Sequence, residues 1–263
     1  MIRTLTATRY VTPLREGGSL PAVVEADDDG LYVLKFRGAG QGPKALIAEL
    51  IAGEIGRALA LLVPEIVLMQ LDPALGRSEP DFEIQALLKA SAGLNLALDF
   101  LPGALPYNPI TGPRDVSIVP ALASTIVWFD AYISNPDRTA RNTNMLIWHK
   151  RLWLIDHGAA LYFHHAGDDY RARSASRFAP IKDHVLLPFA SMLAEVDEAL
   201  SLKLTPDLVR EILAAIPGEW LGNGSSFATP DAQRAAYLDY LVSRLQAPRH
   251  FVEEAINARA QLL

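Results

Sequence analysis

Three short segments of the sequence hold side chains that could act together on a phosphate group. Lys35 ends an apolar run, Asp137 is followed by Asn142 and Asn144 in an irregular segment, and Asp156 follows a second apolar run. Mg²⁺ takes oxygen ligands, usually one or two carboxylates together with substrate phosphates. A lysine adds a compact positive charge that can face phosphate oxygens. The residue types therefore predict metal-assisted phosphate chemistry.

A short hairpin would bring most of these oxygens together. If residues 149–150 form its turn, antiparallel pairing places residue 144 roughly opposite residue 156. Two carboxylates about 4 Å apart repel by about 1 kcal/mol in water and about 4 kcal/mol at an effective dielectric constant of 20. A divalent cation reverses the sign of this interaction. The alternative is that Asp137 only forms an Asx-turn that closes a helix.

The position of Lys35 on its strand predicts which way it points. Side chains alternate along a strand, so Lys35 shares a face with Leu31 and Val33. In the helix that follows, Glu54 lies within the apolar stripe and Glu49 faces away from it. The pattern by itself therefore favours Glu54 as a buried partner of Lys35. The alternative is an edge-strand lysine that extends into solvent.

The elements that position these residues fall into two parts. Apolar runs and turn signals predict a β-rich part with one helix, followed by a proline- and glycine-rich boundary and a mainly helical part that contains the short hairpin. The predicted class is α+β, with lobes at residues 1–102 and 103–263. The expected strands are 6–12, 22–24, 31–36, 65–71, 94–101, 145–148 and 152–155, and the expected helices include 44–61, 119–134 and two that start at Thr205-Pro206 and Thr229-Pro230.

Composition excludes several classes of protein. The chain of 263 residues has 24 basic and 30 acidic side chains, a net charge of −6, and 50% hydrophobic residues. Nucleic-acid binding needs a basic footprint, so no nucleic-acid partner is expected. The absence of cysteine excludes disulfides and thiolate metal sites. No apolar run resembles a signal peptide or a membrane span, which predicts a cytoplasmic protein.

The order of the three segments is the order used by protein kinases: a lysine on a strand, an acid in a catalytic loop, and Asp-x-Gly after a strand. Residues 32–36, 48–52 and 63–65 resemble the nucleotide lobe of HipA-like kinases. Residues 135–138 and 154–158 are similar to the catalytic lobe of that family and, more distantly, of phosphoinositide kinases. The resemblance extends over roughly residues 15 to 165. It implies a bilobal, protein-kinase-like fold with a small β-rich N-lobe and a larger helical C-lobe.

The resemblance also implies a role for each residue. Lys35 would contact the α- and β-phosphates of ATP, and Glu49 rather than Glu54 would pair with it. Asp137 would accept the proton of the attacking hydroxyl, and Asp156 would bind Mg²⁺. The second protein ligand of the metal stays open: Asn142 has the family's five-residue offset from Asp137, whereas the hairpin register favours Asn144.

The nucleotide itself would meet two further segments. By resemblance, the loop Gly17-Gly18-Ser19 covers the phosphates, although it lacks the full Gly-x-Gly-x-x-Gly pattern. The hinge against adenine would run from Asp99 through Phe100 and Leu101 to Gly103.

The predicted function is ATP- and Mg²⁺-dependent phosphate transfer to a hydroxyl, with a protein serine or threonine as the preferred acceptor. A lipid or small-molecule acceptor, and an ATP-binding pseudokinase scaffold, are the alternatives. Residues 170–177, Tyr-Arg-Ala-Arg-Ser-Ala-Ser-Arg, lie where a kinase has its activation or substrate-binding segment. The same residues could equally be a solvated basic loop.

Overall fold

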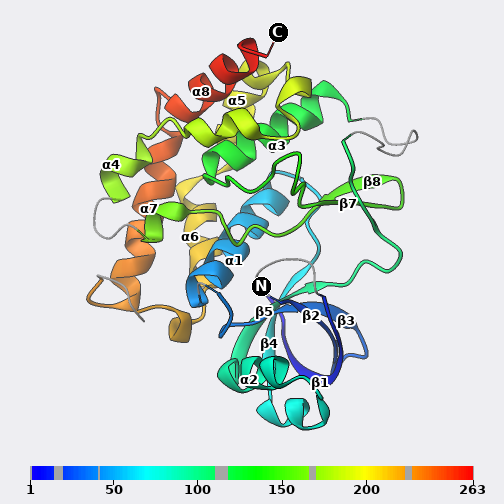
Figure 1. Ribbon diagram of the computed structural model, residues 1–263. Helices are drawn as coiled ribbons and strands as arrows, with labels where there is room; N and C mark the ends of the chain where they lie inside the picture. The colour runs from blue at the N-terminus through cyan, green and yellow to red at the C-terminus, as the bar shows by residue number, and fades with distance from the viewer. Residues whose placement is uncertain are drawn as a thin grey trace.

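A computed structural model describes residues 2–14, 20–40, 42–109, 118–165, 170–222 and 227–262. A β-barrel occupies one end of the molecule and most of the helices occupy the other (Figure 1). No helix in these described ranges has the length and apolar character needed to cross a bilayer.

The N-terminal strands close into a barrel in the order β1-β2-β3-β5-β4. The strands are β1 (Thr4–Pro13), β2 (Ala22–Ala26), β3 (Leu31–Lys35), β4 (Ile66–Leu71) and β5 (Gly93–Asp99). The hairpin predicted around residues 27–30 is present, because β2 and β3 pair antiparallel. Closure comes from a short parallel pairing of β1 with β4, which local sequence patterns do not predict.

Helices accompany the barrel at two places. The predicted helix is α1 (Pro43–Ala58), which packs against β4, β5 and the later helix α6 (Pro206–Ala214). Residues 72–93 carry no element predicted from the sequence, and the structure has η1 (Pro73–Ser78) and α2 (Phe82–Ala90) there. The N-cap of α2 is Asp81, whose side chain accepts a hydrogen bond from the Glu83 backbone.

The predicted short hairpin is present as β7 (Met145–Trp148) and β8 (Arg151–Leu154), with β6 (Leu105–Pro106) added beside β7. Its register differs by one residue from the expected one. His149 and Lys150 form a two-residue turn with positive φ, so Trp148 pairs with Arg151. Asn144 therefore lies opposite Ile155, whose N–H donates to the Asn144 carbonyl at 3.0 Å.

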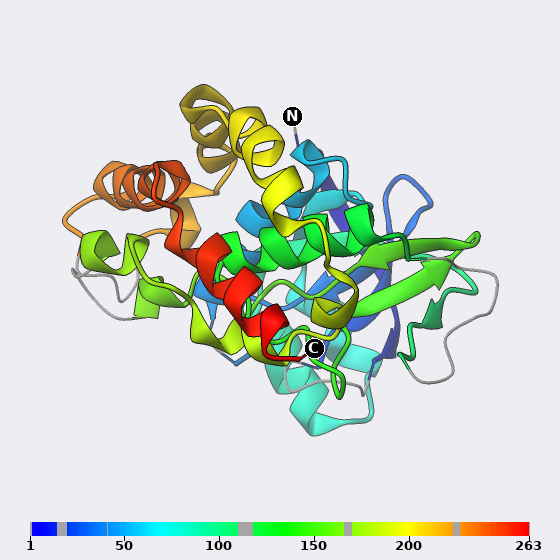
Figure 2. The ribbon, with the colours of Figure 1, turned by 90° about the horizontal axis from the view of Figure 1, so that it is seen from above.

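The helical part is built around α3 (Pro120–Tyr132), against which α5 (Leu193–Lys203) and α8 (His250–Ala260) pack (Figure 2). Thr205 and Thr229 cap α6 and α7 (Pro230–Leu245) through their side chains, as predicted. The remaining elements are α4 (Tyr170–Ser174), η2 (Tyr162–His165), η3 (Ala179–Asp183), η4 (Leu187–Phe189) and η5 (Gly218–Trp220). The segment after α3 carries the Asp137 loop and leads into β7, so the hairpin and α3 together position that loop.

Candidate active site

Lys35 connects three elements of the fold. Its Nζ lies 2.6 Å from Glu49 Oε2 on α1 and 2.5 Å from Asp156 Oδ1 after β8. The helical-wheel preference for Glu54 is wrong, because Glu54 pairs with Arg57 at 3.4 Å. The physical reason is that α1 is covered on more than one side, so its apolar stripe does not identify a single buried face.

Glu49 is fully buried and is bound from both sides. Besides Lys35, its Oε2 accepts the His157 N–H at 2.9 Å, and its Oε1 lies 3.2 Å from His157 Nδ1. Burial would raise the pKa of Glu49, but the charge of Lys35 and the bonds from His157 outweigh it and hold the pKa at about 2. Burial likewise acts to lower the pKa of Lys35, and Glu49 and Asp156 reverse this and raise it. The pair is therefore ionised at neutral pH.

Asp137 is surrounded by asparagine side chains. Its Oδ2 accepts Nδ2–H bonds from Asn142 at 2.9 Å and from Asn144 at 3.2 Å, and its backbone N–H donates to Asn135 Oδ1 at 3.1 Å. Both candidate metal ligands thus use their amide nitrogen toward Asp137, which leaves each amide oxygen as the donor for a cation. The structure brings both asparagines to Asp137. Because both make the same kind of bond to it, this contact does not decide which of them is the metal ligand.

The donor set fits a hard cation. Across the part of the chain that the structure describes, no group of three or more His, Cys, Asp or Glu side chains could hold a metal by itself. Asp156 and the asparagine amides supply the few oxygens that Mg²⁺ takes from a protein when phosphates complete its shell. These residues would hold the cation, and its chemistry there would be to neutralise charge on the phosphates.

Two of these residues have strained backbones. Asn144 and Asp156 have φ values of 47° and 57°, in the left-handed region that costs an L-residue roughly 1–2 kcal/mol. Asn and Asp tolerate this region better than most residues. Strain of this kind persists only where the surrounding contacts determine it, and it concentrates at functional sites.

A buried ion pair beneath the loop holds Asp137 in place. Arg138 Nε donates to Asp130 Oδ2 at 2.6 Å, and both side chains are fully buried. Asp130 Oδ1 also accepts a bond from Asn135 Nδ2 at 2.8 Å, and Arg138 donates to the Asn144 carbonyl. Burial opposes ionisation of Asp130, but Arg138 and His184 lower its pKa below the ordinary value. The residues on both sides of Asp137 are therefore tied to α3.

His184 adds a third partner from a distant segment. Its Nδ1 accepts the Leu186 N–H at 3.0 Å, so the proton of the neutral ring is on Nε2, which lies 2.9 Å from Asp130 Oδ2. Burial lowers the pKa of His184, consistent with this neutral form. Asp130 and His184 are not among the site residues predicted from the sequence. The sequence does contain a signal for Asp130, because it is an acid inside the otherwise apolar helix predicted at residues 119–134.

The predicted adenine hinge is partly engaged in the barrel. The N–H of Asp99 donates to the Glu65 carbonyl and that of Phe100 to the Leu31 carbonyl, both at 2.9 Å. The Leu101 carbonyl accepts the Ala104 N–H at 3.1 Å, and the Leu101 N–H donates to none of the described residues. The predicted hinge also contains Gly103, whose N–H likewise donates to none of the described residues, so Leu101 and Gly103 carry the two hinge N–H groups left for a base. The predicted phosphate-covering loop, Gly17-Gly18-Ser19, lies outside the described residues.

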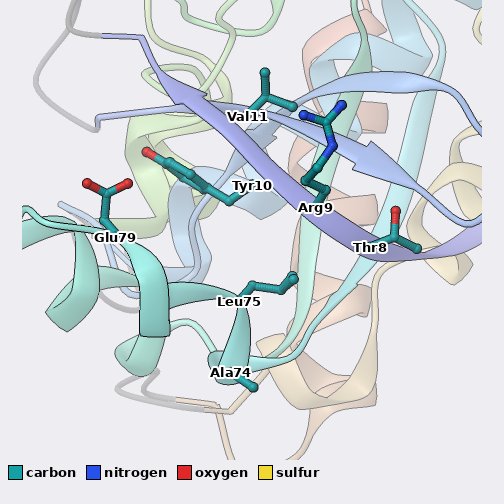
Figure 3. A pocket seen from close by; sticks show the side chains of 7 residues that line it. All are labelled: Thr8, Arg9, Tyr10, Val11, Ala74, Leu75 and Glu79. Carbon is teal, nitrogen blue, oxygen red and sulfur yellow. The ribbon is translucent and has the colours of Figure 1, made fainter.

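A pocket of about 430 Å³ lies elsewhere, on the outside of the barrel (Figure 3). Residues of β1 and of the η1 region line it, namely Thr8, Arg9, Tyr10, Val11, Ala74, Leu75 and Glu79. None of these residues belongs to the lysine–carboxylate cluster formed by Lys35, Glu49 and Asp156.

Comparison with known proteins identifies the fold around this cluster. A family model described as HipA-like kinase matches residues 8–253. The chain belongs to the HipA-like kinase family. The protein is therefore a kinase-type phosphotransferase, as the resemblance predicted. A search of curated proteins finds no match.

Two solved structures that are similar to this chain are kinases. The Helicobacter pylori proinflammatory kinase CtkA is similar with a TM-score of 0.58 at 12% identity, over 100% of this chain and 99% of CtkA. The Golgi casein kinase with Mn and ADP bound gives 0.52 at 13% identity, over 94% of this HipA-like chain and 75% of that one. At these identities the similarity establishes the fold.

Proposed function

We propose that this HipA-like kinase transfers the γ-phosphate of ATP, with Mg²⁺, to a serine or threonine hydroxyl of a protein. The observation that carries the proposal is the position of Lys35. It contacts Glu49 and Asp156 at once, so the strand, α1 and the Asp-His-Gly segment meet at one charged group. This is the lysine–glutamate pair and metal-binding aspartate that kinase chemistry requires together.

Each residue then has a defined role. Lys35 binds the α- and β-phosphates, and Glu49 holds its ammonium in place from a fully buried position. Asp137 orients the acceptor hydroxyl and receives its proton, while the asparagine amides hold its carboxylate at 2.9 and 3.2 Å. Asp156 would hold the cation, which would neutralise charge on the phosphates. The chain's contribution is positioning and electrostatic stabilisation, which is the main work in phosphoryl transfer.

Radiolabelled ATP with a panel of generic protein acceptors tests the proposal. Wild-type protein should transfer label to serine or threonine, identified by phosphoamino acid analysis, and EDTA should abolish transfer. Asp137→Asn should lower kcat by roughly 10²–10⁴-fold, the range for loss of a general base. Asp207→Asn, in an exposed ion pair on α6, is the matched control and should keep full activity.

Three results would decide against the proposal. Label found only on lipids or small molecules would show that the acceptor is not a protein hydroxyl. ATP binding without transfer in any fraction would make the protein a scaffold. Wild-type turnover by Asp137→Asn would remove that residue from its role.

A further inference from the structure

Arg244 on α7 is a buried cation with no carboxylate partner among the described residues. Its side chain makes hydrogen bonds only to neutral oxygens: the Tyr132 carbonyl at 2.9 Å, the Ala131 carbonyl at 2.8 Å, and the Ser174 and Ser176 carbonyls at 3.0 and 3.1 Å. Arg244 as a whole is 2% exposed. Buried charges are normally paired, because desolvation is costly.

Partial negative charges near the guanidinium compensate the positive charge of Arg244 in part. The carbonyls of Ala131 and Tyr132 are at the C-terminal end of α3, where the helix dipole is negative. The Phe251 ring centroid lies 4.9 Å from the guanidinium carbon. Burial nevertheless lowers the pKa of Arg244. The acceptors that contact its guanidinium among the described residues are all neutral oxygens.

Ser176 lies at the exposed end of this arrangement. Its Oγ is 3.4 Å from Arg244 Nη1, a long contact that a stronger acceptor would shorten. Arg173 and Arg177 flank it in sequence and are exposed. Arg177 pairs with Glu253 at 3.4 Å, and Arg173 forms no ion pair within the described ranges. Two guanidinium groups, those of Arg173 and Arg177, therefore belong to the segment around Ser176, and the third, that of Arg244, belongs to α7.

We infer that Ser176 is a phosphorylation site, and that Arg244, with Arg173 and Arg177 at the rim, binds the phosphate. A phosphoserine at residue 176 brings about −1.5 to −2 charge and three strong acceptor oxygens to an exposed side chain whose Oγ already lies 3.4 Å from Arg244 Nη1. The phosphate would replace the long hydroxyl contact with charge-assisted bonds and would compete with Glu253 for Arg177.

This inference rests on the proposed kinase activity for the source of the phosphate. Ser176 Oγ attacks the γ-phosphorus of ATP, a bond between Oγ and phosphorus forms, and the bond to the β,γ-bridging oxygen breaks. The electron pair of that bond leaves with ADP, and the hydroxyl proton passes to Asp137 of the acting molecule.

The location gives the phosphate a regulatory effect. Arg244 binds the end of α3 and the segment after α4 at once, and α4 packs on α7 (Figure 1). The loop that contains Asn135 and Asp137 follows α3 after only two intervening residues, 133 and 134. A phosphate on Ser176 would therefore fasten the segment of residues 174–178 to the end of the helix that positions the catalytic loop. We expect the phosphorylated protein to be more stable and more active.

Ser174 is a control within the same segment. It also follows Arg173, but its Oγ donates to the Arg171 carbonyl at 2.7 Å and makes no contact with the Arg244 side chain. The two serines have similar basic neighbours in the sequence, but in the structure only the Ser176 hydroxyl contacts the Arg244 side chain. Phosphorylation directed by charge along the sequence would affect both, and the proposed site predicts Ser176.

The first experiment maps phosphate on the full chain after incubation with ATP and Mg²⁺. Mass spectrometry of peptides should find phosphate on Ser176 in the wild type and none there in Asp156→Asn. Transfer to a generic acceptor is measured in the same sample. An active enzyme with unmodified Ser176, or with phosphate on Ser174 in its place, overturns the inference and leaves the proposed function standing.

The second experiment does not need the protein's own activity. Phosphoserine is incorporated during translation at residue 176 or at residue 174, and the thermal midpoint of each product is measured. Phosphoserine at 176 should raise the midpoint by roughly 2–6 °C, and phosphoserine at 174 should not. Arg173→Gln with Arg177→Gln, both on the surface, should remove much of the rise. Equal midpoints for the two phosphoproteins would overturn the inference, even if the enzyme proved inactive.

Discussion

Replacing Asp130 by asparagine removes one charge from a fully buried ion pair without changing the size of the side chain. Asp130 is the carboxylate partner of Arg138 among the described residues, at 2.6 Å, and it also receives bonds from Asn135 and His184. The amide of the replacement can keep some of these bonds but does not carry the charge. The Arg138 guanidinium would then be buried without a counter-ion, the situation in which removal of one partner is most costly.

The magnitude follows from the burial of both groups. Two unit charges about 4 Å apart attract by about 4 kcal/mol at an effective dielectric constant of 20, and breaking buried pairs costs about 3–5 kcal/mol. We expect Asp130→Asn to lower the free energy of unfolding by that amount, a large part of the roughly 5–15 kcal/mol typical of a domain. Because the Asp137 loop is attached to this pair, kcat should fall more than the KM for ATP rises.

Urea unfolding followed by circular dichroism measures the loss of stability. Asp207→Asn, which breaks an exposed pair with Arg210 and removes an acid from the first turn of α6, is the matched control and should lower the free energy of unfolding by less than about 1 kcal/mol. If the cost comes from the isolated guanidinium, Arg138→Met combined with Asp130→Asn should be less destabilised than the sum of the single variants by about 1–3 kcal/mol. An unfolding free energy for Asp130→Asn within about 1 kcal/mol of wild type, or strict additivity in the double variant, would refute this reasoning.

The remaining predictions concern the other buried groups of the site. Glu49→Gln should lower the free energy of unfolding by less than Asp130→Asn does, because Lys35 keeps a second carboxylate, and the difference is measured in the same urea experiment. Since the folded pKa of Glu49 is about 2, below the ordinary 4.5, its contribution is present above pH 4.5 and is lost as the pH falls toward 2. His184 has a lowered folded pKa, so wild-type stability should fall as the pH drops below about 6.5, and His184→Gln should reduce that slope by up to about 1.4 kcal/mol per pH unit. A slope unchanged in His184→Gln would contradict its burial as a neutral ring.

Several elements could be predicted from local sequence because short-range chemistry determines them. The hairpin at β2 and β3 follows from a turn-rich segment between two apolar runs, and the Thr-Pro pairs begin α6 and α7 as expected. The hairpin β7–β8 was predicted with its turn at residues 149–150. That two-residue turn pairs Trp148 with Arg151, and counting back along the strands places Asn144 opposite Ile155, one position from the approximate partner, Asp156.

The choice between Glu49 and Glu54 shows where local patterns fail. A helical wheel assumes that one face of a helix is buried, and α1 is packed against strands and against α6. Glu49 is stable in that environment because Lys35 and His157, from two other segments, neutralise and bind it. The family resemblance favoured Glu49 because it reflects the contact with Lys35, a residue outside the helix, whereas a helical wheel considers only residues of the helix itself.

The amino-acid sequence by itself determined which side chains are available for phosphate chemistry, the order in which they occur and most of the elements that carry them, since these depend on neighbours a few residues apart. Tertiary structure decided which of them meet. Lys35 and Asp156 are 121 positions apart in the chain, and Asp130 and His184 are 54 apart. Contacts of such separation form only when barrel closure and helix packing compensate the entropy of ordering the chain between them.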